Sequence, residues 1–176
     1  MLGTQVGSAV DIRAARPDDD EERVRLFLGS LSRATLTNRF FVGLGRPSER
    51  LVRAMVARDD RRDALLALHG DAVIGHAMSH LADGAYGVEA EIGVVVDDRW
   101  QNLGVGSRLV RTLLRRASVR GAVVVGMDVM TENRRVLAMV RRTWPSATID
   151  TQGTSVEIKA RLAFAEQGSV GSPLTM

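Results

Sequence analysis

The sequence predicts an α+β (mixed α/β) domain, in which short strands and amphipathic helices share one core. Two patterns lead to this prediction. Ile92 to Val96 is an apolar run rich in β-branched residues, as is typical of a strand, whereas Leu109 to Ala117 repeats its apolar residues at helical spacing. A chain of 176 residues can bury one substantial core. We expect residues 10–165 to form this single domain, with residues 1–9 and 166–176 as flexible ends.

The N-terminal half is predicted to contain both helices and strands, as judged by apolar periodicity and turn residues. The acidic run Asp18 to Glu22, directly after Pro17, is typical of a helix N-terminus because carboxylates complement the helix dipole. In chain order, the expected elements are a strand at 10–15, a helix beginning at Pro17, a connection or second short helix at 30–38, a helix at 48–56 capped by Ser48, a hairpin formed by 64–69 and 72–80, and a Gly-rich turn at 82–88.

The C-terminal half is predicted to continue the pattern. Asp97 and Asp98 end the apolar strand, and the amphipathic helix follows two glycines. The exposed final strand could pair with a second copy of the chain, which would give a homodimer. The remaining expected elements are a central strand at 122–129 after Gly121, a helix N-capped by Thr131 and ended by Trp144-Pro145, and two strands at 148–150 and 154–161 around Gly153.

Composition excludes several classes of function. The chain has no cysteine, which excludes disulfides, thiolate metal sites and a cysteine acyl intermediate. His76 and His80 share a strand face without a third ligand, so we expect ordinary histidines and no metal, with proton transfer as their alternative role. Aromatic residues make up 4% and do not alternate with basic ones, so no nucleic-acid partner is expected. The absence of a bilayer-spanning run or signal peptide favours a cytoplasmic protein with no membrane partner.

The basic residues are almost all arginine. Lys159 is the only lysine among 24 Lys and Arg residues, and the positive charge is concentrated between Arg99 and Arg142. A guanidinium group can pair with phosphate through two parallel hydrogen bonds. This composition therefore suits a phosphate-rich ligand.

Glu91 to Val119 contains the most specific motif in the chain. Gln101, Gly104 and Gly106 form Q-x-x-G-x-G between the predicted strand and helix. The free N–H groups of a helix's first turn attract anions, and glycines let a phosphate approach them. We therefore interpret this junction as a pyrophosphate site rather than a simple loop. A dinucleotide fingerprint would need a third glycine where Leu109 stands, which disfavours a nucleotide-dependent oxidoreductase.

A family resemblance begins at Glu91, where E-I-G-V-V-V-D-D-R-W-Q-N-L-G-V-G-S-R-L is similar to the acetyl-CoA-binding motif of the GNAT superfamily of N-acetyltransferases. Met130 to Arg142 is similar to the segment that follows the next strand in this family, and Arg39-Phe40-Phe41 resembles the bacterial protein-lysine acetyltransferase branch. The resemblance covers residues 10–162. It implies a central, mostly antiparallel, twisted sheet of six to seven strands flanked by about four helices. The cofactor strand would splay from its neighbour, and Gly93 is where a bulge would be tolerated.

The resemblance also implies the site residues. Glu91 would be the general base, directly or through water, with Glu89 as a second candidate on the same strand face. Arg39, Phe40 and Phe41 would line the acceptor pocket. The cosubstrate would be acetyl-CoA or another acyl-CoA, bound by Val94, Val95, Val96, Gln101, Asn102, Leu103, Gly104, Val105, Gly106, Ser107, Arg108 and Asn133, with Arg99 as a further candidate near its phosphates.

We therefore expect an enzyme that transfers acetyl directly from acetyl-CoA to an amine, with a protein lysine as its acceptor. A small-molecule amine is the alternative acceptor, and a catalytically weak acyl-CoA-binding regulatory module is the alternative function. Many GNAT enzymes protonate the leaving thiolate with a tyrosine in the helix after Asn133, but this sequence has none there. Water or a histidine would then supply the proton.

Overall fold

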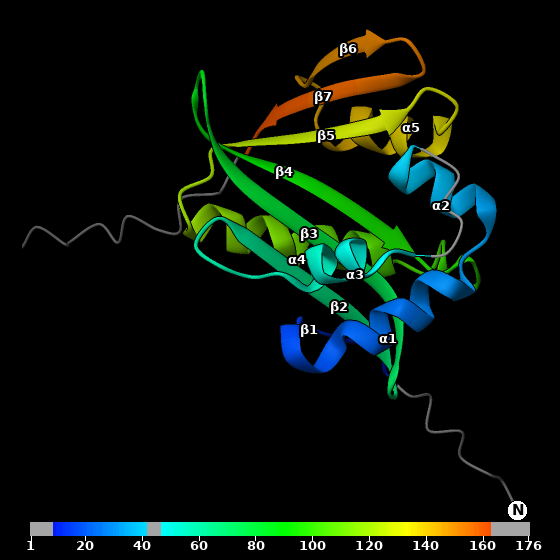
Figure 1. The fold of residues 1–176 in the computed structure, drawn as a ribbon. Coiled ribbons are helices and arrows are strands. Elements are labelled where there is room, and N and C mark those ends of the chain that lie inside the picture. Colours follow the sequence, from blue (N-terminus) through cyan, green and yellow to red (C-terminus); the bar gives the residue numbers. More distant parts are fainter. Residues whose placement is uncertain (1–8, 42–46, 163–176) are drawn as a thin grey trace, which may run out of the picture.

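The computed structural model describes residues 9–41 and 47–162, so the ends expected to be flexible fall outside these ranges except for residue 9. The described residues contain one seven-stranded sheet with the order β1-β2-β3-β4-β5-β7-β6 (Figure 1). Its strands are β1 (Asp11–Ala14), β2 (Arg62–His69), β3 (Ala72–Gly84), β4 (Gly87–Val96), β5 (Val124–Met130), β6 (Thr148–Gln152) and β7 (Ser155–Arg161). The helices are α1 (Pro17–Ser30), α2 (Arg33–Phe40), α3 (Glu49–Val56), α4 (Val105–Val119) and α5 (Arg134–Thr143), with a 3₁₀ turn, η1, at Asp98–Trp100.

The helices cover both faces of the sheet (Figure 1). We call the face covered by α1, α2 and α3 the front face, and the face covered by α4 and α5 the back face. Ile92, Val94 and Val96 of β4 pack with α4 on the back face, whereas Val95 is buried with α1 and α3. Because side chains alternate along a strand, Glu91 projects to the front. Within the described ranges, no helix combines the length and apolar composition needed to cross a membrane.

β4 and β5 run parallel and separate soon after they meet (Figure 1). They pair at three positions, Glu89 with Val124, Ala90 with Val125 and Glu91 with Gly126. Beyond this point β4 continues to Val96 and β5 to Met130 without pairing with each other. One edge of β4 therefore has no strand beside it from Ile92 onward, and the predicted splay is confirmed.

The separation of the two strands does not use a bulge at Gly93. The ladder between β3 and β4 runs without a register shift from the pair Gly75–Val96 to the pair Gly84–Gly87. A register shift occurs instead between β2 and β3, at Ala67 and Leu68. The expectation of a bulge was therefore wrong, because β4 keeps full pairing with β3 while it loses β5.

The β3–β4 hairpin is longer than the sequence suggested. A Gly-rich turn was expected over residues 82–88, but Ala82 pairs with Glu89 and Asp83 with Val88 inside the ladder. Only the residues between Gly84 and Gly87 make the turn. Small residues at these positions indicated a loop, yet their backbone groups still complete the pairing of two long strands.

The helix α5 and the sheet edge also differ from expectation. Asn133, not Thr131, caps α5: its Oδ1 accepts a hydrogen bond from the backbone N of Val136 at 3.3 Å. Thr131 instead donates from Oγ1 to the carbonyl oxygen of Thr154 at 3.2 Å. The final strand, β7, lies between β5 and β6, so the exposed edge on this side belongs to β6. Pairing through the final strand was therefore a wrong expectation.

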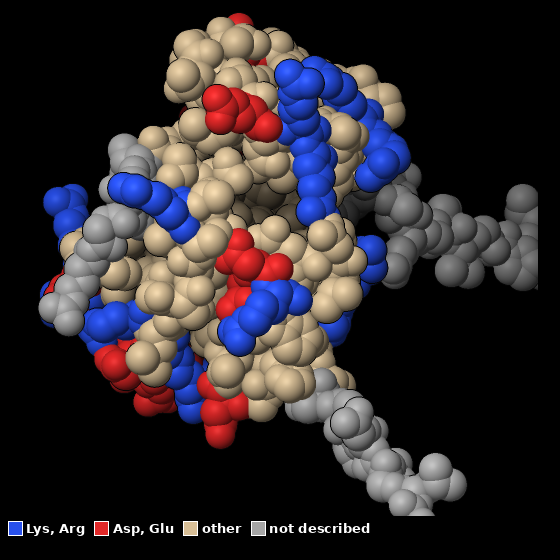
Figure 2. All heavy atoms as spheres, turned by 90° about the vertical axis from the view of Figure 1, so that its right-hand side faces the viewer, with Lys and Arg blue, Asp and Glu red and all other residues tan. Residues whose placement is uncertain are grey.

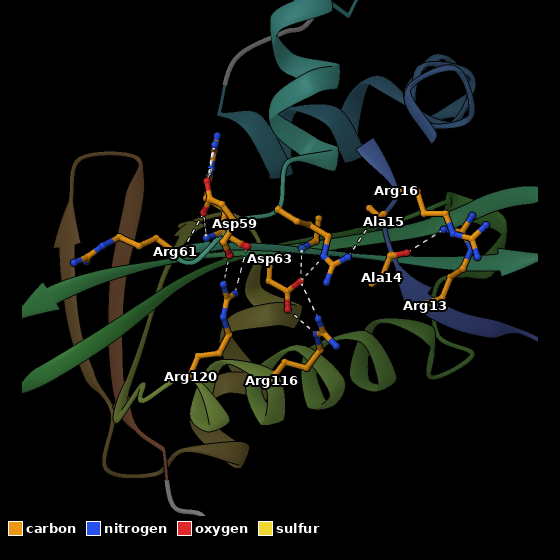
Figure 3. Close-up of polar contacts among 12 residues, drawn as sticks. Arg13, Ala14, Ala15, Arg16, Asp59, Arg61, Asp63, Arg116 and Arg120 are labelled. Carbon is orange, nitrogen blue, oxygen red and sulfur yellow. Dashed lines mark hydrogen bonds and ion pairs between the residues drawn. The ribbon is translucent and has the colours of Figure 1, made fainter. Parts of the chain in front are cut away.

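A buried carboxylate ties α4 to the sheet on the side away from the strand opening (Figure 3). Asp63 of β2 is 2% exposed and accepts hydrogen bonds from Nε of Arg116 on α4 at 2.5 Å and from Nε of Arg58 at 3.1 Å. Burial raises the pKa of Asp63, but the hydrogen bonds from Arg116 and Arg58 outweigh it, so the pKa lies below its usual value. The ionised carboxylate thus fixes α4 against β2.

We predict that Asp63→Asn lowers the free energy of unfolding by about 2 kcal/mol, because it weakens charge-assisted hydrogen bonds at a buried site. Urea or thermal unfolding measures this loss. A depressed pKa means that the contribution is present above the unfolded-state pKa of about 3.9 and is lost as pH falls, so the difference from wild type should shrink in acid.

Asp59→Asn is the matched control for this prediction. Asp59 also accepts hydrogen bonds from Arg62, but its side chain is 44% exposed. Solvent screening makes such a pair weak, so the control variant should unfold close to wild type. Equal losses for the two variants would contradict the importance of the buried site.

Candidate active site

The molecule is hollowed on the side toward which β4 and β5 point (Figure 2). Basic side chains reach the upper rim of this hollow and acidic side chains lie at its lower rim. The free edge of β4 ends at the loop that leads through η1 to α4, and α2 contacts both β4 and β5. The opening between the strands is therefore bordered by a strand edge, a loop and a helix.

The loop between β4 and α4 is fastened to the first turn of α2. Asp98 accepts hydrogen bonds from the backbone N and Oγ of Ser32 at 2.9 and 2.6 Å, and from Oγ1 of Thr35 at 2.8 Å. Gln101 donates from Nε2 to the carbonyl oxygen of Val96 at 3.1 Å and to Thr35 Oγ1 at 3.2 Å. These contacts join α2, the loop and the end of β4 into one unit, in which Gln101 closes the turn.

The first turn of α4 is open. Gly104, its N-cap, has φ +82°, and no side chain caps the helix. A Cβ at position 104 would have no atom within 4 Å, whereas one at Gly106 would lie 3.6 Å from Val96, an ordinary contact. Asn102 also has a positive φ, of 67°, and Leu103 beside it is exposed. Position 104 thus needs glycine for its backbone, and the free N–H groups behind it can bind an anion.

Two arginines near this turn are directed elsewhere. Arg99 donates from Nε and Nη2 to the carboxylate of Asp97 at 3.0 and 2.9 Å. Arg108 donates from Nη2 to the carbonyl oxygen of Val10, just before β1. Backbone N–H groups, rather than these guanidinium groups, are therefore the ready anion donors at the start of α4.

The free edge of β4 supplies further polar groups. Val94, Val95 and Val96 lie on this edge beyond the last residue paired with β5, so their backbone includes groups without a strand partner. Asn133 is the N-cap residue of α5. Its Oδ1 is used in capping, which leaves the side-chain –NH₂ group to donate to a ligand.

Two carboxylates meet at the point where the strands separate. A Cβ on Gly126 would lie 2.5 Å from Oε1 of Glu89 and 3.1 Å from Oε1 of Glu91, so glycine leaves the room that both need. Glu89 is 8% exposed and pairs with Lys159, whose Nζ lies 3.1 Å from Oε1. Glu91 is more exposed and has His80 as its cross-strand neighbour on β3. The structure thus brings together both predicted carboxylates.

The environment of Glu91 favours its protonated form. Burial is the largest cause that raises its pKa above the usual value, and the negative charges of Glu89, Asp128 and Glu157 raise it further. The positive charge of Lys159 lowers it in part. A carboxylate with a raised pKa is a stronger base at neutral pH than an ordinary one.

Arg39, at the end of α2, projects onto β4. A Cβ on Gly93 would collide with its guanidinium group, so this glycine accommodates the arginine. Burial lowers the pKa of Arg39, and its buried Nε has no hydrogen-bond partner among the described residues. The ring centroid of Phe40 lies 4.9 Å from its Cζ, and Phe41 ends the helix with φ 64°. Arg39 therefore lies against the front of β4, whereas Phe40 packs on the front core and Phe41 is exposed at the end of α2.

The other candidate proton donors, two histidines and the single tyrosine, differ in how close they lie to Glu91. His76 is fully buried, and its Nε2 lies 2.7 Å from the carbonyl oxygen of Met55. Burial, the largest cause, lowers the pKa of His76 to about 4. Tyr86, the only tyrosine in the sequence, is 78% exposed in the β3–β4 turn, at the opposite end of β4 from Val96. His80, beside Glu91, is the better placed histidine.

Sequence reasoning did not place Asp128 and Lys159 at this site. Alternation along a strand could assign each to a face, but it does not show that β5 is followed in space by β7. The strand register shows how these residues meet, because Gly126 pairs with both Glu91 and Lys159, and Asp128 pairs with Glu157. The acidic character of the opening thus arises from three strands together.

The fold and the site define a class of protein that holds a phosphate-bearing ligand between a helix N-terminus and a free strand edge. Residues 33–143 match the model of the Acetyltransferase (GNAT) family. The chain belongs to this family, and the protein is an acetyl-CoA-dependent N-acetyltransferase. The sequence-based identification of the family and its fold is confirmed.

Solved structures share this fold. The GNAT domain of S. lividans PAT matches with a TM-score of 0.77 and 24% identity, covering 87% of this chain and 90% of that one. PaiA N-acetyltransferase from Thermoplasma acidophilum, solved with coenzyme A, has a TM-score of 0.68 and 13% identity over 88% of this chain and 99% of its own. The ribosomal-protein-S18-alanine N-acetyltransferase from Escherichia coli has a TM-score of 0.66 and 13% identity, covering 90% and 97%.

We predict that Gly104→Ala weakens acetyl-CoA binding about tenfold, equivalent to ~1.4 kcal/mol, because a Cβ disfavours the positive φ that opens the first turn of α4. Isothermal titration calorimetry measures this change. Gly121→Ala is the matched control, since Gly121 follows the other end of α4 with φ +96° and nothing within 4 Å of its Cβ position. Both variants should lose similar stability, and a loss of affinity in both would show that strain, not the site, is responsible.

Proposed function

We propose that this acetyltransferase modifies the ε-amine of protein lysines and that Glu91 is its general base. The observation that carries the proposal is the position of the Glu91 carboxylate over Gly126, where β4 and β5 separate. A lysine ammonium has a pKa near 10.4 and must lose a proton before its nitrogen can attack a thioester. An accessible carboxylate with a raised pKa, at the entrance to the strand opening, suits this proton transfer.

The open turn and the free strand edge support a binding mode for acetyl-CoA, which supplies the activated acetyl group. The N–H groups of the first turn of α4 would hold its pyrophosphate, and the edge of β4 would pair with its pantetheine amides and donate an N–H to the thioester oxygen. The residues proposed to bind acetyl-CoA are Val94, Val95, Val96, Gln101, Asn102, Leu103, Gly104, Val105, Gly106, Ser107, Arg108 and Asn133. Of these, Arg108 would have to release the carbonyl oxygen of Val10 before its guanidinium group could reach a phosphate.

Glu91 is a better candidate base than Glu89. The carboxylate of Glu89 is almost buried and is engaged by Nζ of Lys159. Glu91 has no ion pair among the described residues and is open to the front face, where an acceptor can reach it. Glu89 would have to break its ion pair with Lys159 before it could accept a proton. Proton transfer to Glu91 does not carry this energetic cost.

The front face of the opening supports a cationic, macromolecular acceptor. Asp128 and Glu157 add negative charge beside Glu91, and the front of β5, β7 and β6 carries exposed polar side chains rather than a helix. Such an open surface can accept a peptide, and the half-buried side chain of Arg39 can donate from its guanidinium group to one of its oxygens. Phe40 and Phe41 would line the acceptor pocket, as the resemblance of this segment to protein-lysine acetyltransferases implies.

We predict that Glu91→Gln lowers kcat by about 10²- to 10⁴-fold, because a neutral amide cannot accept the ammonium proton. The affinity for acetyl-CoA should stay near that of wild type. Steady-state kinetics with a lysine peptide, together with calorimetric titration of acetyl-CoA, separates these effects. Glu89→Gln is the matched comparison, and a larger loss of kcat in that variant would transfer the role of base to Glu89.

The pH profile gives a second, directional prediction for Glu91. Activity should rise with pH as Glu91 ionises, with an apparent pKa above the usual glutamate value of about 4.3. Asp128 raises the pKa of Glu91, so Asp128→Asn should move the acid limb of kcat/KM to lower pH. An unchanged acid limb would mean that another group controls it.

The acceptor class is tested with labelled acetyl-CoA in a cell lysate, beside a panel containing a lysine peptide, an N-terminal alanine peptide and small amines. We expect label on lysine ε-amines of proteins. Label on metabolites or panel amines alone would favour the small-molecule alternative. Tight binding of acetyl-CoA with no transfer would favour a regulatory module. The lack of a tyrosine in α5 to protonate the leaving thiolate is the feature that favours this alternative.

A further inference from the structure

The only lysine of the chain lies at the proposed acceptor site. Lys159 is on β7, and its Nζ lies 3.1 Å from Oε1 of Glu89 and 3.4 Å from Oε1 of Glu157. Its side chain is 45% exposed on the front face. A chain with 24 Lys and Arg residues thus has its single ε-amine within contact distance of the carboxylate next to Glu91.

The register explains how a residue two strands away reaches β4. Glu91, Gly126 and Lys159 occupy one row across β4, β5 and β7. Neighbouring strands lie about 4.8 Å apart, and an extended lysine side chain spans more than one strand. Gly126 has no side chain to block the way, so the ammonium group crosses β5 and meets the carboxylate of Glu89, two residues before Glu91.

We propose that Lys159 is a self-acetylation site of this enzyme. The inference rests on the proposed function, because it uses the same base and the same donor. Glu91 takes a proton from the ammonium group of Lys159, and the freed nitrogen attacks the carbonyl carbon of the thioester. A C–N bond forms and the C–S bond breaks, the nitrogen releases its second proton to solvent, and the departing coenzyme A thiolate takes up one proton from solvent. The product is a neutral acetamide at position 159 and free coenzyme A.

Acetylation of Lys159 would change the electrostatics of the opening. The ammonium group pairs with Glu89 and Glu157, and its charge lowers the pKa of Glu91. An acetamide has no charge, so these carboxylates would lose their cation and the pKa of Glu91 would rise. A higher pKa leaves less of the base ionised at a given pH. Self-acetylation would therefore move the acid limb of the activity profile to higher pH. At pH values on this limb the modified enzyme would be slower than the unmodified one.

The test is to incubate the purified chain with acetyl-CoA and follow its intact mass and its tryptic peptides. We expect the gain of one acetyl group and the loss of tryptic cleavage after Lys159, at least about a hundredfold faster than in the same chain unfolded in urea. The rate per molecule should not depend on protein concentration. Excess free coenzyme A should suppress it, because the donor site would be filled. Lys159→Arg, which keeps the positive charge, should abolish the modification.

Parallel arms separate this inference from the proposed function. Acetylation of an external lysine peptide with Lys159 unmodified would overturn the self-acetylation site and leave the function intact. Transfer to neither would overturn both. Three further results would also overturn the self-acetylation site. They are equal modification of folded and unfolded chains, a rate proportional to protein concentration, and label confined to the N-terminal amine. Glu91→Gln should slow the modification with unchanged circular dichroism, and the coenzyme A competition decides the question if that variant does not fold.

Discussion

The separation of β4 from β5 after Glu91 and Gly126 is the constraint on which the rest of the structure depends. A strand that loses its neighbour leaves N–H and C=O groups unpaired, and such groups are costly when buried without a partner. The edge of β4 must therefore stay accessible to water or to a ligand. α2 borders the gap on the front and α4 packs behind β4, so the sheet keeps its core while this one edge remains open.

Polar contacts fasten the elements around the gap, whereas apolar packing fills the layers behind it. Asp98 and Gln101 attach the loop before α4 to α2, and Asp63 attaches the far end of α4 to β2. In the second case a planar guanidinium donates twice to one carboxylate. Such two-bond geometry fixes orientation as well as distance, which gives a structural reason for a chain that uses arginine almost exclusively.

Much of the fold was predictable because its signals are local. The hairpin around Gly70-Asp71, the cap at Ser48 and the glycine that begins α4 each depend on residues near in sequence. The site was only partly predictable, because its charges come from strands whose neighbours are set by tertiary packing. Nothing near Lys159 indicates that it faces Glu89, and nothing near Gly93 indicates that Arg39 fills the space above it. The prediction of the α5 cap was wrong for a simpler reason: Thr131 and Asn133 are both good N-caps, and in the structure Thr131 bonds to Thr154 while Asn133 caps the helix.

The attachment of α2 to the loop before α4 has a kinetic consequence. The first turn of this eight-residue helix is bonded to Asp98 in the loop that begins the donor site, while its last turn carries Arg39 toward the acceptor side. One short helix therefore contacts both the loop that begins the donor site and the strand that borders the acceptor side. The lack of cysteine excludes an acyl-cysteine intermediate, and the direct transfer that we propose needs both substrates bound together. We therefore expect transfer within a ternary complex, in which α2 holds the elements of the donor site and the acceptor site in a fixed relation.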